Sequence, residues 1–146
     1  MKIVSKLAAV AAVFLLTAGF ISCKKESTNT TEEQYKANCT GANQAPPNSS
    51  TATATFVGKY NSSTGTFSGT LTYTGITPTG WYVQKGTASA NGEIVASLGA
   101  VVGSPFSFSI QMNASAAAEL KAGAYYINVQ SAAYPSGEIR GKLVLQ

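Results

Sequence analysis

Residue types that support common enzyme chemistry are scarce in this chain. It has 146 residues and no His, and all six of its acidic residues are Glu. Without His or Asp it cannot form a His-dependent catalytic triad, an HExxH zinc motif, an imidazole metal site or an aspartate-based Mg²⁺ or Ca²⁺ site. We therefore expect no metal and no cofactor, and most catalytic mechanisms are excluded.

Glutamate pairs are the one catalytic arrangement that remains. Glycosidic hydrolysis needs two carboxylates placed on either side of the bond. The expected folded part contains Glu93, Glu119 and Glu138, and Glu119 falls on an expected helix. A hydrolase that uses Glu93 and Glu138 stays as an alternative, but nothing in their spacing favours it. We therefore predict that the protein is not an enzyme.

Two polar pairs are candidates for binding a ligand or partner. Tyr82 and Gln84 are two residues apart, as are Asn128 and Gln130. Residues two apart on a strand share one face of the sheet. Each pair is therefore a candidate recognition patch, with an ordinary hydrated sheet surface as the alternative.

The N-terminus has the pattern of an export signal followed by a lipid anchor. Lys2 and Lys6 precede an uncharged apolar stretch at residues 7–20, which is short for a transmembrane span. Cys23 follows a small residue directly behind this stretch and resembles the lipobox of bacterial lipoproteins, with Phe20 where Leu is usual. We expect residues 1–22 to be removed and Cys23 to carry acyl chains such as palmitate. The alternative is an ordinary secretory signal in which Cys23 is incidental.

The remainder divides into a tether and one domain. Residues 24–34 are polar and lack apolar periodicity, so residues 23–34 are predicted to be a lipidated tether and residues 35–146 the domain. If Cys23 is acylated, Cys39 has no intramolecular partner. We expect a buried, inert thiol, with a reactive or dimer-forming thiol as the alternative.

Alternating apolar and polar residues predict an all-β domain. The chain is only 11% charged, and its net charge of +4 forms no concentrated basic patch, so no nucleic-acid partner is expected. Residues 113–122 favour one short helix that begins after Asn113 and ends before Gly123. About eight short strands with such connections are typical of a single sandwich or Greek-key barrel. The expected strands lie at residues 35–40, 51–60, 66–74, 81–85, 93–98, 106–112, 125–130 and 139–145.

The last hairpin carries a family resemblance. Its sequence is YINVQSAAYPSGEIRGKL, with Ile139, Gly141, Leu143 and Leu145 predicted on the core side of the last strand. The hairpin resembles the end of the CHRD domain, which is named after chordin and is also found in exported bacterial proteins. The segments GANQAPPNSSTATA (41–54) and WYVQKGTA (81–88) are similar to earlier family segments, so the resemblance covers about residues 35–146. The shared hairpin motif comprises Pro135, Gly137, Glu138, Arg140 and Gly141.

The resemblance implies a fold related to Cu,Zn superoxide dismutase, in which the two polar pairs converge. Family histidines align with Tyr82, Gln84 and Gln130, and a family Glu aligns with Gln44. Neutral amides and a phenol are poor ligands for Zn²⁺ or Cu²⁺, so the metal-binding or redox alternative is disfavoured.

The final motif has a structural and a functional interpretation. Glu138 and Arg140 share a face, so they are predicted to pin the last strand, by a charge-assisted pair or by Arg140 reaching a loop carbonyl. The alternative is that Arg140 binds an anion or a partner.

Together these features predict a non-catalytic lipoprotein of the bacterial cell envelope, at the outer membrane, facing the periplasm or the outside. It would attach to the membrane through Cys23, and its CHRD-like module would bind a protein or a glycan. The predicted patch is Tyr82, Gln84, Asn128 and Gln130.

Overall fold

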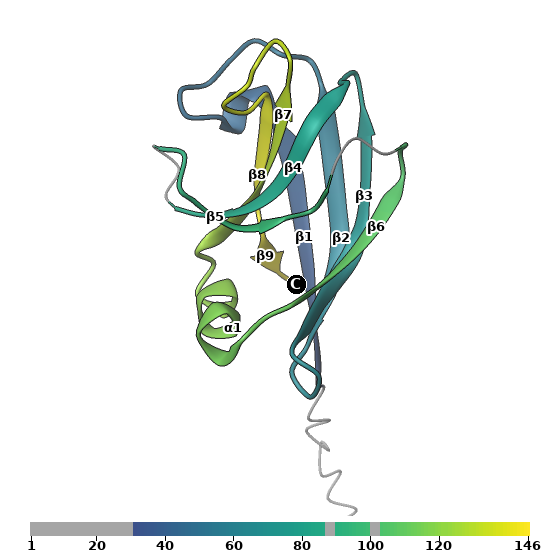
Figure 1. Cartoon of the computed structure of the whole chain (residues 1–146), viewed down its shortest axis with the longest axis vertical. Coiled ribbons are helices and arrows are strands. Elements are labelled where there is room, and N and C mark those ends of the chain that lie inside the picture. Colours follow the sequence, from purple (N-terminus) through teal and green to yellow (C-terminus); the bar gives the residue numbers. More distant parts are fainter. Residues whose placement is uncertain (1–30, 87–89, 100–102) are drawn as a thin grey trace, which may run out of the picture.

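A computed structural model describes residues 31–86, 90–99 and 103–146 (Figure 1). The predicted signal peptide at residues 1–22 and the predicted lipidation site Cys23 lie outside the described residues. Within the described part of the chain, no helix has the length and apolar character needed to cross a membrane.

One antiparallel sheet forms the domain, and it curls into a nearly closed barrel (Figure 1). The strand order is β5-β4-β7-β8-β1-β2-β3-β6, and β9 pairs with β1. The all-β prediction with one short helix is confirmed. The strands are β1 (Glu32–Thr40), β2 (Thr53–Asn61), β3 (Thr66–Thr74), β4 (Pro78–Lys85), β5 (Glu93–Ser97), β6 (Phe106–Gln111), β7 (Tyr125–Ser131), β8 (Ile139–Lys142) and β9 (Val144–Leu145).

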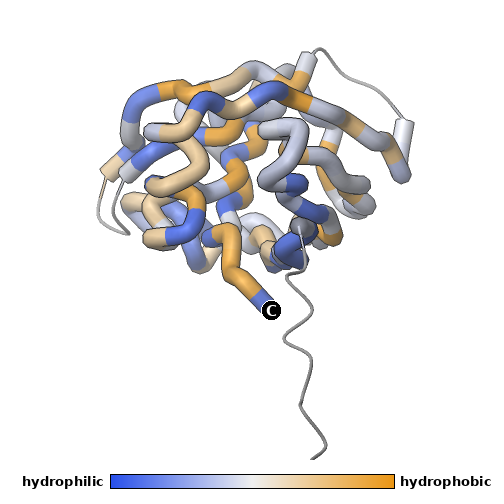
Figure 2. The backbone as a smooth tube through the Cα atoms, turned by 90° about the horizontal axis from the view of Figure 1, so that it is seen from below, coloured by the Kyte–Doolittle hydropathy of each residue, from blue (hydrophilic) through white to orange (hydrophobic). Residues whose placement is uncertain are grey.

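Period-two alternation places the core inside the barrel, as predicted. Every second residue of β2, including Phe56 and Tyr60, is buried, and the intervening Thr residues are exposed. Phe67 of β3 lies 5.4 Å from Phe56 between ring centroids, and Phe108 of β6 stacks on Phe56 at 5.5 Å. Orange and blue segments alternate along the chain in Figure 2 for this reason.

Aromatic packing seals the barrel where backbone pairing stops. The edge strands β5 and β6 are not paired with each other in the described sheet. Instead, the fully buried Trp81 of β4 lies 5.2 Å from Phe106 of β6 and 5.1 Å from Tyr73 of β3, measured between ring centroids. Side chains therefore join β4 to β3 and β6, at the opposite edge of the sheet.

Helix α1 (Ala114–Lys121) covers one end of the barrel, in the connection between β6 and β7. Its N-terminus is capped as predicted, because the Asn113 side chain accepts a hydrogen bond of 2.9 Å from the backbone N–H of Ala116. Ala117 and Leu120 are buried against the core. Burial of this apolar face fixes the helix over the open barrel end.

Ion pairs at both sides of α1 reinforce this position. Lys121 Nζ lies 2.7 Å from Glu33 of β1. Glu119 pairs with Lys85 of β4 and accepts a hydrogen bond of 2.7 Å from the Tyr125 hydroxyl. The hydrogen bonds from Lys85 and Tyr125 hold the pKa of Glu119 below its usual value. The helix is thus tied to both halves of the sheet.

Three expectations about strand ends were wrong, and one of them is that β4 begins at Pro78 rather than at residue 81. The first strand begins at Glu32 rather than residue 35, because its pairing with β2 continues to Asn61 and Lys59 forms a 2.6 Å ion pair with Glu32. Three residues of the predicted tether therefore belong to the sheet. Leu145, predicted to lie in the core, is 49% exposed. Its strand β9 pairs only with β1 in the described sheet, so no further strand covers it.

Candidate functional site

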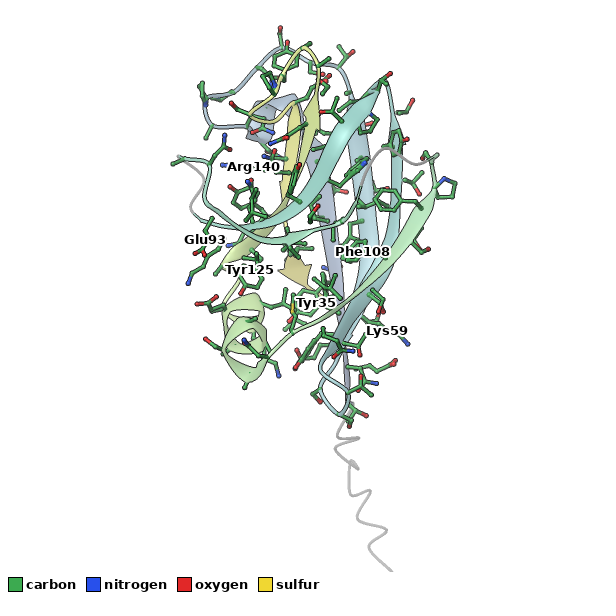
Figure 3. The ribbon with its side chains drawn as sticks, viewed as in Figure 1. Tyr35, Lys59, Glu93, Phe108, Tyr125 and Arg140 are labelled. Atoms are coloured by element: carbon green, nitrogen blue, oxygen red, sulfur yellow. The ribbon has the colours of Figure 1, made fainter. Side chains whose placement is uncertain are left out.

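The candidate site begins at the barrel end opposite α1, where the segment after β1 folds back over the outside of β7 and β8 (Figures 1 and 3), and it extends along these strands to Tyr125, which bonds to Glu119 of α1. The pairing registers determine which side chains meet there. Tyr82 of β4 is opposite Asn128 of β7, and Gln130 is opposite Gly80. Gln84 is opposite Tyr126. All four residues of the predicted patch therefore lie on one outer face of the sheet.

Burial divides this patch. Asn128 is fully buried and Gln84 is 5% exposed, whereas Tyr82 and Gln130 are partly exposed. Gln44 Nε2 donates a 2.8 Å hydrogen bond to Asn128 Oδ1, and Asn128 Nδ2 donates to the carbonyl of Ser136 at 3.1 Å. Asn128 therefore holds two loops to the sheet and does not face a ligand.

The donor set at this face does not fit a transition metal. The positions that align with the family's histidines and glutamate hold Tyr82, Gln84, Gln130 and Gln44. Gln44 is already bonded to Asn128. Gln84 Oε1 is buried without a hydrogen-bond partner, but one amide oxygen is a weak and insufficient ligand. The described residues contain no group of three or more His, Cys, Asp or Glu that could hold an ion.

Arg140 connects two loops to the last long strand. Its Nε donates to the carbonyl of Asn43 at 3.1 Å, and its Nη1 donates to the carbonyl of Ala90 at 3.1 Å. The guanidinium carbon lies 4.4 Å from the centroid of the Tyr126 ring, a favourable cation–π distance. The Tyr126 hydroxyl accepts from the backbone N–H of Gly92 at 2.7 Å. Loop carbonyls thus hold this buried cation. This is the second of the two structural arrangements expected from the sequence, in which Arg140 reaches a loop carbonyl.

Glu138 anchors the same loop from its other side. Its carboxylate accepts a 2.6 Å hydrogen bond from Ser50 Oγ, and its backbone carbonyl accepts one of 2.8 Å from Asn48 Nδ2. Asn48 Oδ1 in turn accepts from the backbone N–H of Ser50 at 2.9 Å. Glu138 therefore orders the loop and is only 8% exposed.

The two glycines of the motif are required by close approaches. Gly137 has a φ of +136°, and a Cβ there would lie 2.3 Å from Asn128 Oδ1. A Cβ on Gly141 would lie 2.5 Å from the backbone oxygen of Asn38 on β1. Larger residues would separate the loop from the sheet at Gly137 and β8 from β1 at Gly141.

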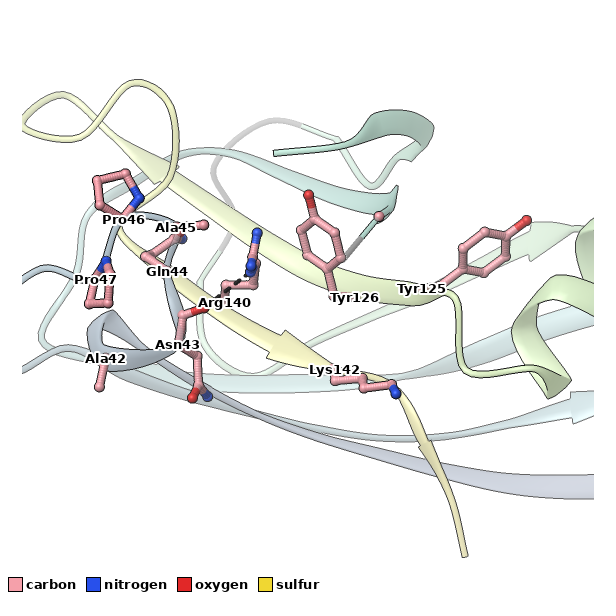
Figure 4. A pocket seen from close by; sticks show the side chains of 11 residues that line it. Ala42, Asn43, Gln44, Ala45, Pro46, Pro47, Tyr125, Tyr126, Arg140 and Lys142 are labelled. Atoms are coloured by element: carbon pink, nitrogen blue, oxygen red, sulfur yellow. Dashed lines mark hydrogen bonds between the residues drawn. The ribbon is translucent and has the colours of Figure 1, made fainter. Parts of the chain in front are cut away.

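A pocket of about 460 Å³ opens between this loop and the strands (Figure 4). Its charged lining residues are Arg140 and Lys142, and no carboxylate lines it. A second pocket of about 290 Å³ lies on the other side of Pro46 and Pro47 and includes Pro135 of the motif. The larger pocket is lined by Ala42, Asn43, Gln44, Ala45, Pro46, Pro47, Gly86, Tyr125, Tyr126, Arg140 and Lys142.

Sequence reasoning missed most of this pocket. Lys142 shares a face with Arg140, which the spacing indicated, but its place in one pocket with the Pro46–Pro47 loop was not predicted. The two consecutive prolines were a signal for a stiff loop that could form a wall. Nothing in the sequence placed that wall against β7 and β8.

Glu93 and Glu138 do not form a carboxylate pair. Glu93 is opposite Lys85, which is opposite Tyr125, whereas the backbone N–H of Glu138 bonds to Val129. The separation of four positions between Tyr125 and Val129 corresponds to about 13 Å along the strand. Glycosidases hold their two carboxyl groups about 5–9.5 Å apart. Glu93 lines a different pocket, near α1.

Cys39 is fully buried in the barrel, and burial raises the pKa of its thiol to about 12. Since the thiolate is the reactive form, we expect Cys39 to resist iodoacetamide at about pH 8 in the folded protein and to react on unfolding. Mass spectrometry of the Cys23→Ser chain, in which Cys39 is the only thiol, would measure this. Rapid alkylation of the folded chain would contradict it.

The same burial makes stability depend on pH. The thiol titrates near 9.0 when exposed and near 12 when folded. Between these values the unfolded chain has lost a proton that the folded chain keeps, so the contribution is complete below pH 9 and is lost as the pH rises towards 12. The Cys39→Ala chain should lack this component of the alkaline loss of stability.

Comparison with known proteins adds one finding. The family model described as the CHRD domain matches residues 35–143, a stretch that runs from β1 through the pocket and the glycine motif. No curated protein and no solved structure matches the chain.

Proposed function

This chain belongs to the CHRD domain family, a binding or interaction type of module, and on that basis we propose that it is a non-catalytic lipoprotein of the bacterial envelope whose pocket holds a protein or glycan partner. The resemblance carried by the last hairpin is thereby confirmed. The pocket between the 42–47 loop and strands β7 and β8 is the proposed binding site.

The observation that carries this proposal is the way the pocket is built. Its wall is fixed by Arg140 and Gln44, which bond the loop and the sheet to each other, and both are almost fully buried. A concave site that is formed in advance avoids the cost of ordering loops when the partner binds. Its volume lies within the range of about 300–1,000 Å³ that is usual for ligand sites.

The direction of β1 supports presentation of the 42–47 loop of the pocket away from the membrane. The chain enters the barrel at Glu32, beside the α1 end, and reaches the pocket loop directly after Thr40. Nine strand residues span about 30 Å. An acyl chain on Cys23 would therefore anchor the domain by the end that lies far from the 42–47 loop of the pocket.

Site-specific photocrosslinking in living cells tests this function. A benzoylphenylalanine replacing Asn43 at the exposed pocket rim should give a discrete crosslinked product in the full-length protein. The same group replacing the exposed Thr72, on β3 outside the pocket, is the control and should not give that product. Identical products from both positions, or none from position 43, would reject the pocket as the binding site.

A further inference from the structure

We infer that the pocket takes an acidic saccharide, a sugar ring that carries a carboxylate or sulfate group, with Lys142 contacting the anion. This inference rests on the proposed function and specifies the ligand class of the same site. It follows from the charge of the lining residues, from the pairing of the surrounding strands on both edges, and from the side chains exposed in the pocket.

Charge is the first step. Lys142 is exposed at the pocket, and Arg140 lies at its inner wall (Figure 4). The ion pairs of the described residues use other lysines, at positions 59, 85 and 121, so Lys142 has no carboxylate partner among them. Two positive charges and no carboxylate in the lining produce a positive potential in a partly enclosed site, which attracts anions.

Arg140 contributes charge without having to move. The carbonyls of Asn43 and Ala90 and the ring of Tyr126 fix its guanidinium, which is 3% exposed. Arg140 is therefore a positioning residue that fixes the pocket wall, whereas the flexible Lys142 can bond the anion directly.

The strands around the pocket argue against an extended peptide. β7 is paired on one edge with β4 and on the other with β8, and β8 lies between β7 and β1. No free strand edge is therefore available at the pocket for a peptide to extend the sheet. Tyr125 and Tyr126 are 1% and 4% exposed, too little to form the open aromatic groove that Pro-rich peptides use.

The exposed surfaces of the pocket suit a sugar ring. Pro46 and Pro47 offer flat apolar faces. The exposed side chain of Asn43, whose Nδ2 already donates to the carbonyl of Asn38 at 3.2 Å, offers its other N–H and its Oδ1. A saccharide has both apolar C–H faces and hydroxyl groups, so it can use both kinds of surface. An added carboxylate or sulfate would then meet Lys142.

Isothermal titration calorimetry of the full-length protein tests the ligand class. Trigalacturonic acid or sulfated maltotriose should bind, and this binding should weaken as salt is added because the contact is partly exposed. Neutral maltotriose should bind at least about tenfold more weakly. Equal binding of neutral maltotriose, stronger binding of an oligoglutamate peptide, or binding of neither acidic saccharide would overturn the inference.

Matched variants locate the contact. Lys142→Gln should weaken binding of the acidic saccharide about tenfold, whereas Lys36→Gln, the same charge change on exposed β1 outside the pocket, should not. Ala42→Glu adds a carboxylate at the rim and should weaken binding, whereas the equally large Ala42→Gln should weaken it less. Equal effects of Lys142→Gln and Lys36→Gln would overturn the assignment.

The two proposals fail in different ways. If no acidic saccharide binds but photocrosslinking from position 43 still gives its product, the ligand class is wrong and the pocket remains the binding site. If that product is also absent, the proposed function fails as well.

Discussion

We expect the Cys23→Ser chain to take up no radioactive palmitate and to leave the membrane fraction almost completely. The thiol of Cys23 is the predicted acylation site, and a hydroxyl cannot replace it. Each buried CH₂ of an acyl chain contributes about 0.8 kcal/mol to membrane binding, so several chains anchor a protein stably and their loss leaves a water-soluble domain. Cell fractionation and palmitate labelling measure both effects.

The second cysteine supplies the control. The Cys39→Ala chain should keep its palmitate label and its membrane location, because Cys39 is fully buried in the barrel and burial raises the pKa of its thiol. Palmitate that persists in the Cys23→Ser chain would contradict the assignment of Cys23 as the acylated residue. Phe20, which stands where Leu is usual, would then argue against a lipobox.

The second large effect concerns Arg140. We expect Arg140→Met to lower the free energy of unfolding by about 2–4 kcal/mol, because the carbonyls of Asn43 and Ala90 lose a charged donor and Tyr126 loses its cation–π contact. The wall of the pocket should loosen together with this loss. Urea unfolding followed by tryptophan fluorescence measures the change, since Trp81 is fully buried and is the only tryptophan of the chain.

Lys142→Met is the matched control for this prediction. Lys142 lies two residues further along β8 and is exposed, so its replacement should change the free energy of unfolding by less than about 0.5 kcal/mol. The two variants thus separate the cation that holds the loop from the cation proposed to meet the ligand. Similar stability losses in both would contradict that division.

Local patterns were sufficient for most of the fold. Residues 66–74 were predicted as a strand with the observed bounds, and the helix began after Asn113 as expected. These elements depend on period-two alternation and on capping, which act over a few residues. The start of β1 was missed because Glu32 joins the sheet only through its pairing with Asn61, almost thirty residues later.

The candidate site was only partly predictable. The sequence placed Tyr82 with Gln84 and Asn128 with Gln130, and the structure brings both pairs to one face. It did not show that Asn128 and Gln84 would be buried, Asn128 beneath two loops. Burial of a polar residue depends on what covers it, and spacing along one strand carries no information about that cover.

The sequence by itself determined the residue types available, the strand periodicity, the export signal pattern and the family motif. The absence of His and Asp alone excluded many chemistries, because no fold can supply a missing side chain. Only the tertiary structure decided that a pocket exists and which cations line it. Its defining hydrogen bonds join Arg140 to Asn43, 97 residues apart, and Gln44 to Asn128, 84 residues apart. Such contacts arise from the packing of the whole barrel, so no local pattern specifies them.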